Sequence, residues 1–306
     1  MKNIKKSILV ILVVFIASFT NLSAQTTKPL SGMCIALVHG ILGFDDTNGL
    51  AGGLVKYWGG MDEYLRSQGA IVITPGSSAA NSIATRATQT RDQITPWMSA
   101  NKCSKVHLVG HSQGGLVVRY ITSNLGYSSK VASVSTVNSL HKGAPMADIV
   151  LGIIPSWLKP FANSALSLLA KLVYRDGRPQ DVISMGQSLT VSYVTAFNKS
   201  TPDSTGIKYY SYGSKMAFAD IIQHPIMALT YPITWAGGLA YGLGADNDGV
   251  VPIVSQQYGT YKGEPSSNWY ATGIDHLQAT NFEWSGQNYF DVNGWYSTIA
   301  KTARGY

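Results

Sequence analysis

Short apolar runs alternate with longer amphipathic stretches along the first half of the chain. The short runs are rich in aliphatic and β-branched side chains and are typical of buried parallel strands: residues 33–38, 70–74, 105–110 and 130–137. The stretches between them have helical spacing: residues 57–68, 82–100 and 113–125. This alternation predicts an α/β fold with a mostly parallel sheet that carries helices on both faces.

The pattern changes after this alternating part. A first apolar insert, residues 143–178, contains too many apolar residues for one strand, and their spacing predicts two helices broken at Pro155 and Pro160. A second apolar insert covers residues 221–243. Both inserts are expected to be additions to one domain, because no repeat or linker divides the chain.

The second insert is expected to be irregular where Pro225 and Pro232 interrupt it. Between the two inserts, residues 186–198 have helical spacing and residues 207–212 form a short run typical of a strand. The strand-and-helix order of the first half therefore continues between the inserts.

The first 24 residues are typical of a secretory signal peptide. Lys2, Lys5 and Lys6 precede an apolar stretch at residues 8–17, and small residues end at Ala24. The apolar stretch is shorter than the ~20 residues of a membrane-spanning helix. We therefore expect cleavage near Ala24, a single mature domain at residues 25–306, and a secreted protein that is extracellular or periplasmic.

Composition and charge narrow the class of protein. With 45% hydrophobic and 13% charged residues, the chain can bury enough apolar surface to fold. The formal net charge of +7 falls to +4 without the three leader lysines, because the leader has no other charged residue. This modest charge, without a cluster of Lys and Arg, argues against nucleic acid as a partner.

Cys34 and Cys103 are the two cysteines of the chain. Export permits a disulfide between them, although two cysteines do not make a disulfide-stabilised scaffold. Each lies at or just before a predicted strand, and register counting places the two about three residues out of step. The pairing therefore stays open at this point. Cys and His residues have no spacing typical of a structural zinc site.

The strongest chemical signal is Gly110-His111-Ser112-Gln113-Gly114, which lies between a predicted strand and a predicted helix. This context is that of the nucleophile elbow of the α/β-hydrolase fold. Its glycines allow a sharp turn and a close approach of strand and helix. Ser112 would then be exposed at the carboxyl end of the sheet.

A nucleophilic serine needs a base that a carboxylate orients, and in this fold the chain order is Ser, acid, His. His276 is the histidine that lies late in the chain in a polar, Gly-containing loop. Asp248, before Gly249, is the preferred acid, and Asp246 is the reserve. Asp275 is a weaker choice, because adjacent side chains seldom face each other.

The negatively charged oxygen of an ester-hydrolysis intermediate needs backbone N–H donors. One is expected from Gln113, directly after the serine. The other is expected from Ile41, in the loop after the first strand, where Gly40 and Gly43 allow the backbone to turn toward the serine.

These segments resemble bacterial secreted triacylglycerol lipases of the Pseudomonas, Burkholderia and Proteus type. The resemblance is close from about Gly32 to Ala147 and covers four motifs: residues 38–45, Tyr57-Trp58, residues 106–120 and His141-Lys142-Gly143. Later it is confined to Asn247-Asp248-Gly249 and His276-Leu277. It implies a triad of Ser112, Asp248 and His276, with Ile41 and Gln113 donating to the oxyanion.

The resemblance also implies a helical lid, for which residues 143–178 lie in the expected place. Such a lid would cover an apolar acyl groove and open at a lipid–water interface; a core or dimer-forming helix pair is the alternative. The second insert could line the same groove.

Relatives of this type often hold calcium through an aspartate two residues after the catalytic histidine. Here that position is Gln278, a weaker ligand, and Asp220 aligns only loosely with the second acidic ligand. We therefore expect no cofactor and no calcium of this type.

The sequence predicts a secreted serine carboxylic-ester hydrolase, and a triacylglycerol lipase in particular. A polyester hydrolase or short-chain carboxylesterase of the same fold is an alternative. So are acyl transfer to an acceptor other than water and a non-catalytic surface-binding protein on this scaffold.

Overall fold

The computed structural model describes residues 28–45, 55–152, 178, 180–282 and 289–305. The predicted signal peptide and residues 153–177 of the first insert, where two helices are expected, lie outside the described residues. Within the described part of the chain, no helix has both the length and the apolar character needed to cross a membrane.

The centre of the molecule is a parallel sheet of six strands in the order β2-β1-β3-β4-β5-β6. In chain order the strands are β1 (Cys34–Val38), β2 (Ile71–Ile73), β3 (Val106–His111), β4 (Val131–Val137), β5 (Lys208–Tyr212) and β6 (Thr260–Tyr261). The predicted parallel α/β architecture is confirmed, with the expected strands found to within a residue or two at each end.

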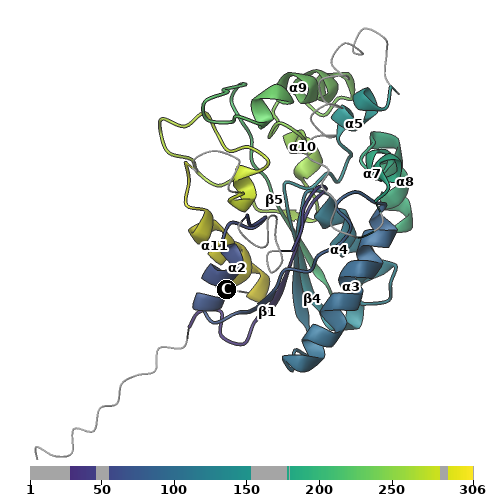
Figure 1. The fold of residues 1–306 in the computed structure, drawn as a ribbon, viewed down its shortest axis with the longest axis vertical. Coiled ribbons are helices and arrows are strands. Elements are labelled where there is room, and N and C mark those ends of the chain that lie inside the picture. The colour runs from purple at the N-terminus through teal and green to yellow at the C-terminus, as the bar shows by residue number, and fades with distance from the viewer. Residues whose placement is uncertain (1–27, 46–54, 153–177, 179, 283–288, 306) are drawn as a thin grey trace, which may run out of the picture.

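Helices cover both faces of the sheet, as the continuous apolar strands require (Figure 1). One face packs against α2 (Met61–Ser67) and α11 (Val292–Arg304). The other packs against α3 (Ile83–Ala100), α4 (Gln113–Ser123) and α8 (Val191–Ser200). Alternate side chains of β1 enter the two cores, since Ile35 and Leu37 belong to one and Ala36 and Val38 to the other.

The remaining helices lie in the connections from β4 to β5 and from β5 to β6. They are α5 (Pro145–Val150), α7 (Val182–Gln187), α9 (Tyr231–Ala240) and α10 (Ile253–Gln256), with short 3₁₀ turns at η1 (Ser128–Lys130), η3 (Met227–Leu229) and η4 (Gln278–Thr280). Helices α5 and α9 lie together at the top of Figure 1, where Ile149 packs against Ile233. The first insert therefore begins in contact with the second.

Two predicted elements differ in detail from the structure. The helix expected over residues 186–198 is two helices, α7 and α8, because the hydroxyl of Thr190 caps a new helix by accepting the N–H of Tyr193 at 3.3 Å. Pro232 does not interrupt a helix but lies in the first turn of α9, where its missing N–H costs nothing.

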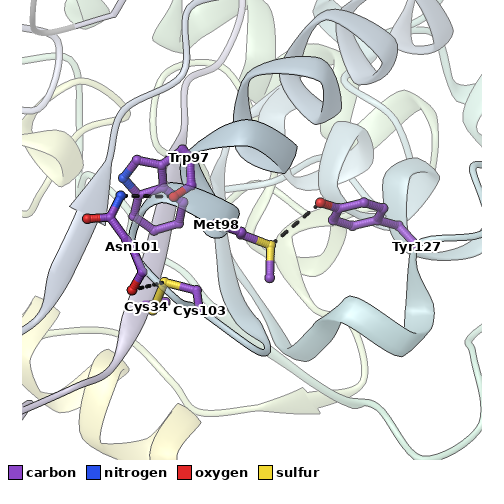
Figure 2. The surroundings of a disulfide bond; sticks show 6 residues. All are labelled: Cys34, Trp97, Met98, Asn101, Cys103 and Tyr127. Carbon is purple, nitrogen blue, oxygen red and sulfur yellow. Dashed lines mark hydrogen bonds between the residues drawn. A yellow bond between two sulfur atoms is a disulfide. The ribbon is translucent and has the colours of Figure 1, made fainter.

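Cys34 and Cys103 form a disulfide, with 6.1 Å between their Cα atoms (Figure 2). The strand register does place Cys34 about three residues out of step with Cys103, since Ile35 pairs with His107. The bond forms because Cys103 lies in the turn before β3 rather than in the strand, and Lys102 in that turn has a φ of 55°.

Candidate active site

Ser112 lies in the sharp turn between β3 and α4. Its φ of 55° and ψ of −131° are rare for a residue with a side chain, as expected for a nucleophile elbow. The backbone is held on both sides: the N–H of Ser112 donates to Val137 at 3.0 Å, and its carbonyl accepts from Ser139 Oγ at 2.7 Å. Local hydrogen bonds therefore maintain the strained geometry.

The glycines around Ser112 are needed for space. A Cβ on Gly110 would lie 2.4 Å from the carbonyl oxygen of Gly114, and a Cβ on Gly114 would lie 2.3 Å from that of Val38. Each distance is far inside van der Waals contact. The G-x-S-x-G motif thus lets α4 start directly against β1 and β3.

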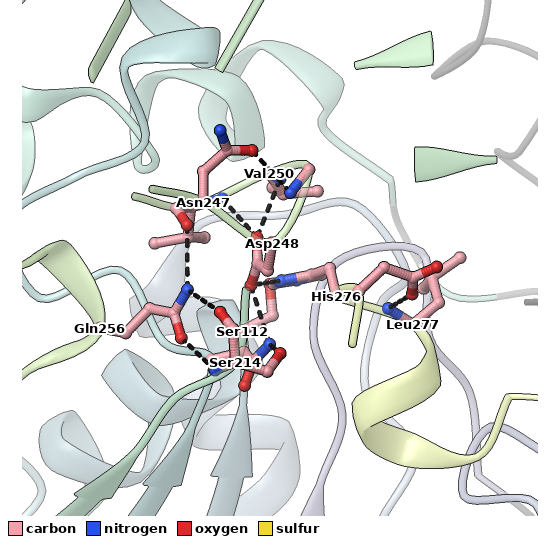
Figure 3. A network of polar contacts seen from close by, with 12 residues as sticks. Ser112, Ser214, Asn247, Asp248, Val250, Gln256, His276 and Leu277 are labelled. Atoms are coloured by element: carbon pink, nitrogen blue, oxygen red, sulfur yellow. Dashed lines mark hydrogen bonds and ion pairs between the residues drawn. The ribbon is translucent and has the colours of Figure 1, made fainter. Parts of the chain in front are cut away.

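Asp248 and His276 come from two later loops and meet beside Ser112 (Figure 3). His276 Nδ1 donates to Asp248 Oδ2 at 2.7 Å, and the N–H of His276 donates to the carbonyl of Asp248 at 2.9 Å. Ser112 is 3% exposed, His276 5% and Asp248 0%. Asp248 and His276 are thus bonded to each other, Ser112 lies beside them in Figure 3, and all three side chains are buried.

The carboxylate of Asp248 is fixed from all sides. Oδ1 accepts the backbone N–H groups of Val250 at 2.9 Å and Val251 at 2.7 Å, and Oδ2 also accepts from Asn138 Nδ2 at 2.8 Å. These bonds fix the direction in which the carboxylate faces His276.

The two other aspartates considered from the sequence lie elsewhere. Asp246 is at the surface and pairs with Lys215 at 2.7 Å. Asp275 is buried but faces away from its neighbour His276, toward His224. Neither contacts the His276 ring in the structure.

The loop after β1 packs directly on Ser112. A Cβ on Gly40 would lie 2.6 Å from Ser112 Cβ and 3.1 Å from Ser112 Oγ, so only glycine permits this approach. The carbonyl of Gly40 accepts from His39 Nδ1 and from Arg86 Nη2, each at 2.8 Å. Because the Ile41 N–H belongs to the same trans peptide, these two bonds also fix its direction.

Arg86 links the two segments expected to bind the oxyanion. This side chain of α3 is 0% exposed and donates to the carbonyl of Gly40 and to the side-chain oxygen of Gln113. Sequence reasoning missed it. The signal was present, because Arg86 lies on the same helical face as Ile83 and Thr90, which are buried.

Tyr57 and His111 connect the loop after β1 with the loop of His276. The N–H of Gly40 donates to Tyr57 Oη at 2.9 Å, and Tyr57 Oη lies 2.6 Å from His111 Nδ1. His111 Nε2 lies 2.9 Å from the carbonyl of His276, which accepts its proton. His111 Nδ1 is then the acceptor for the Tyr57 hydroxyl.

His111 is held in its neutral form. Burial lowers the pKa of His111 well below its ordinary value, and the nearby His276 lowers it further. The two imidazole rings lie 4.6 Å apart. A neutral His111 does not oppose a positive charge that forms on His276.

The calcium site that the resemblance implies does not fit the residues present. Gln278 Nε2 donates to the carbonyl of Gln223 at 2.8 Å, and Gln278 Oε1 accepts the N–H of Asp275 at 3.2 Å. Asp220 Oδ1 accepts backbone N–H groups of Ile222 and Gln223. The oxygens that a hard cation would need are thus occupied by protein donors. Among the described residues, no group of three or more His, Cys, Asp or Glu side chains is arranged to hold a metal ion.

The sequence of this chain is similar to those of triacylglycerol lipases. The sequence model of the palmitoyl protein thioesterase family matches residues 35–188. The chain is 29% identical over 244 residues to a triacylglycerol lipase of Vibrio cholerae, covering 74% of each chain. It is 33% identical over 174 residues to a triacylglycerol lipase of Pseudomonas fragi, covering 55% of this chain and 57% of that one. It spans between about half and three quarters of the length of the curated relatives it matches.

A solved structure confirms the fold. Lipase 1 from Pelosinus fermentans superposes with a TM-score of 0.62 at 20% identity, covering 90% of this chain and 99% of that chain. At this identity the likeness concerns the fold alone, which is that of α/β-hydrolase lipases.

Proposed function

Since this chain belongs to the palmitoyl protein thioesterase family and is a carboxylic ester hydrolase of the α/β-hydrolase fold, we propose that it is a triacylglycerol lipase with a catalytic triad of Ser112, His276 and Asp248. One observation carries the proposal. A charge-assisted hydrogen bond of 2.7 Å joins Asp248 to His276 beside a serine at a strained strand-to-helix turn.

In the first half of the reaction, Ser112 Oγ attacks the ester carbonyl while His276 Nε2 accepts the hydroxyl proton. Asp248 orients the ring and stabilises the imidazolium. The backbone N–H groups of Ile41 and Gln113 donate to the oxyanion, and the positioning of both segments by Arg86 supports this role. His276 then gives its proton to the leaving alcohol, and an acyl-Ser112 ester remains.

In the second half, water attacks the acyl-enzyme. His276 accepts a proton from the water, the same N–H groups stabilise the oxyanion, and the proton returns to Ser112 as the fatty acid leaves. A buried and neutral His111 supports both halves, because a second positive charge would raise the energy of the imidazolium.

Large apolar side chains at the surface support a water-insoluble substrate. Within the described chain they lie after β4, in the connections from β4 to β5 and from β5 to β6 and in the segment after β6: Val182, Ile183, Tyr193, Phe218, Ile221, Ile222, Leu229, Trp235, Leu239, Trp269 and Tyr270. We call this set the apolar rim. Such a surface is costly in water unless it meets lipid or another apolar partner. A lid formed by residues 143–178 and transient contact with a lipid–water interface are part of the same proposal.

Hydrolysis by the chain beginning at Gln25, compared with its Ser112→Ala variant, tests the function. We expect the parent to hydrolyse p-nitrophenyl esters and emulsified triacylglycerol, and the variant to lose about a thousandfold or more of that rate. A variant as active as the parent would exclude the triad and favour a non-catalytic binding protein.

The substrate panel also separates the remaining alternatives. Long-chain emulsions, soluble short-chain esters and polyester film distinguish a lipase from an esterase or a polyester hydrolase. A palmitoyl thioester belongs in the panel because the matching family model is described as a palmitoyl protein thioesterase. Faster turnover of the thioester than of every oxygen ester would replace the lipase proposal.

Secretion is proposed on the predicted leader and is supported by the Cys34–Cys103 bond, since disulfides persist in oxidising compartments. Mass determination of the exported protein tests it. An N-terminus at or near Gln25 is expected; a chain that retains the leader would contradict cleavage.

A further inference from the structure

A second buried imidazole–carboxylate pair lies behind the loop that carries His276. His224 Nδ1 lies 3.1 Å from Asp275 Oδ2, and the two side chains are 0% and 1% exposed. His224 Nε2 lies 3.1 Å from the hydroxyl of Thr272. The proposed reaction uses neither His224 nor Asp275.

Asp275 also organises the backbone that follows it. Its Oδ1 accepts the N–H groups of Leu277 and Gln278, each at 2.8 Å. Its two carboxylate oxygens therefore hold the turn after His276 on one side and His224 on the other. Gln278 completes the connection, because its amide nitrogen donates to the carbonyl of Gln223 at 2.8 Å.

These contacts attach the His276 loop to residues 220–224, a segment that is about 50 residues away in sequence. The same segment leads into η3, where Met227 packs so closely on Gly249 that a Cβ there would lie 2.7 Å from Met227 Cβ. Gly249 follows Asp248. One short segment thus supports both the acid loop and the histidine loop.

We propose that His224, Asp275 and Gln278 form a metal-free clamp that positions His276 against Asp248, in place of the calcium that the resemblance implies. The proposal rests on the proposed function of His276. The three are positioning residues: they contact neither the reacting serine nor the substrate. Direct hydrogen bonds of this kind fix the position of the His276 loop as a bound ion would, without ligand exchange.

The metal-free part is tested by thermal unfolding of the mature chain with excess EDTA and with added calcium. Because an ion that binds only the folded state raises its stability, we expect both conditions to change the Tm by less than about 1 °C. A calcium-dependent rise of several degrees, or a matching fall with EDTA, would overturn it. This measurement needs no turnover, so it stands apart from the proposed function.

The positioning part is tested with two replacements of His224. His224→Leu removes both ring nitrogens, and we expect kcat on a soluble ester to fall about tenfold or more while KM changes less than about threefold. His224→Asn keeps an N–H donor near the position of Nδ1, and we expect it to restore kcat to within about threefold of the parent.

His107→Leu is the matched control, since it removes a largely buried imidazole that is bonded to Ser133 on β3. We expect it to lower the Tm and to leave kcat within about twofold of the parent. Equal kcat in the parent and both His224 variants would overturn the positioning role. If His224→Leu does not fold, the folded His224→Asn variant is compared with the parent alone. A tenfold lower kcat in His224→Asn would contradict the proposed rescue.

Discussion

At the scale of single residues, glycine has two opposite roles in the helices. Gly114 lies in α4 where a Cβ would meet the Val38 carbonyl at 2.3 Å, whereas a Cβ on Gly186 in α7 would lie 3.5 Å from Leu151, an ordinary contact. Replacing a helical glycine by alanine normally stabilises a helix by about 1 kcal/mol. Because of the close contact at Gly114, the same replacement should destabilise the protein there.

We therefore predict that Gly114→Ala lowers the free energy of unfolding by about 2 kcal/mol or more and reduces activity, because α4 must move away from β1. Gly186→Ala should raise the free energy of unfolding by up to about 1 kcal/mol with activity unchanged. Urea unfolding of both variants gives the two values. The same sign of change in both would contradict the packing argument.

Asp246 and Asp248 provide a second matched pair of residues. Asp248 is buried and bonded to His276, and Asp246 is exposed and paired with Lys215. We predict that Asp248→Asn lowers kcat about a thousandfold, since the amide cannot stabilise the imidazolium. Asp246→Asn should remain within about twofold of the parent, because exposed ion pairs contribute little. Comparable losses in the two variants would mean that the acid is not Asp248.

The residues brought together at the site follow sequence signals of different strength. Ser112 could be placed because its motif depends on local geometry, and Asp248 and His276 because the order of segments limits the choice. Arg86, Tyr57 and His224 could not be given roles in the site, since each makes its contacts across the fold with residues 27 to 54 positions away. The pattern of apolar and polar positions does not show which partner a buried polar side chain contacts, so such a residue is assigned to the core or to the surface.

At the scale of elements, alternation of strands and helices was sufficient to predict the parallel sheet. It does not decide local outcomes that depend on single side chains and turns, such as the cysteine pairing, which the sequence left open. Thr190 divides one expected helix into two, and the turn at Lys102 brings Cys103 within reach of Cys34 although the strand register does not. Register counting assumes that a residue continues the strand, and Cys103 precedes it.

The disulfide joins the first strand to the connection between α3 and β3, closing a loop with a sequence separation of 69 residues. Loop-closure entropy for a loop of this size corresponds to a stabilisation of about 4 kcal/mol. We predict that the double variant Cys34→Ser and Cys103→Ser unfolds at a markedly lower Tm and keeps its kcat at a temperature where it is folded. A Tm equal to that of the parent would show that the bond contributes nothing.

At the scale of the whole molecule, several histidines are held neutral by burial, and stability should therefore depend on acid. Burial lowers the pKa of His107 to about 4, below its ordinary value of 6.5. Burial also lowers the pKa values of His39, His111 and His141. Since the unfolded chain binds more protons between pH 6.5 and 4, stability should be fully present above this window and lost as the pH falls through it.

For His107 alone the loss should reach about 3 kcal/mol at the acid end of that window. His107→Asn keeps a polar partner for Ser133 without an imidazole that titrates. We predict a smaller loss of the free energy of unfolding between pH 7 and pH 4.5 in this variant than in the parent, measured with urea at each pH. Equal slopes would show that His107 binds its proton alike in both states.

The exposure of the apolar rim leads to a prediction about substrate. Ile222 is 84% exposed and Trp269 94%, on connections that leave β5 and β6 at the carboxyl edge of the sheet. Each side chain that enters lipid gains about 2 kcal/mol, whereas a charged side chain there opposes binding. Ile222→Glu and Trp269→Glu should therefore lower the rate on emulsified triacylglycerol about tenfold each. Their rate on a dissolved short-chain ester should stay within about twofold of the parent, because that substrate needs no surface contact.

Lys105→Glu, at the exposed amino end of β3, changes the charge on the opposite edge of the sheet and should affect neither rate. Rim variants that lose both rates equally would indicate damage to the site rather than to interfacial contact. Rim variants that keep the full rate on the emulsion would show that the apolar rim does not contact the lipid substrate. The partner of that surface would then have to be another protein.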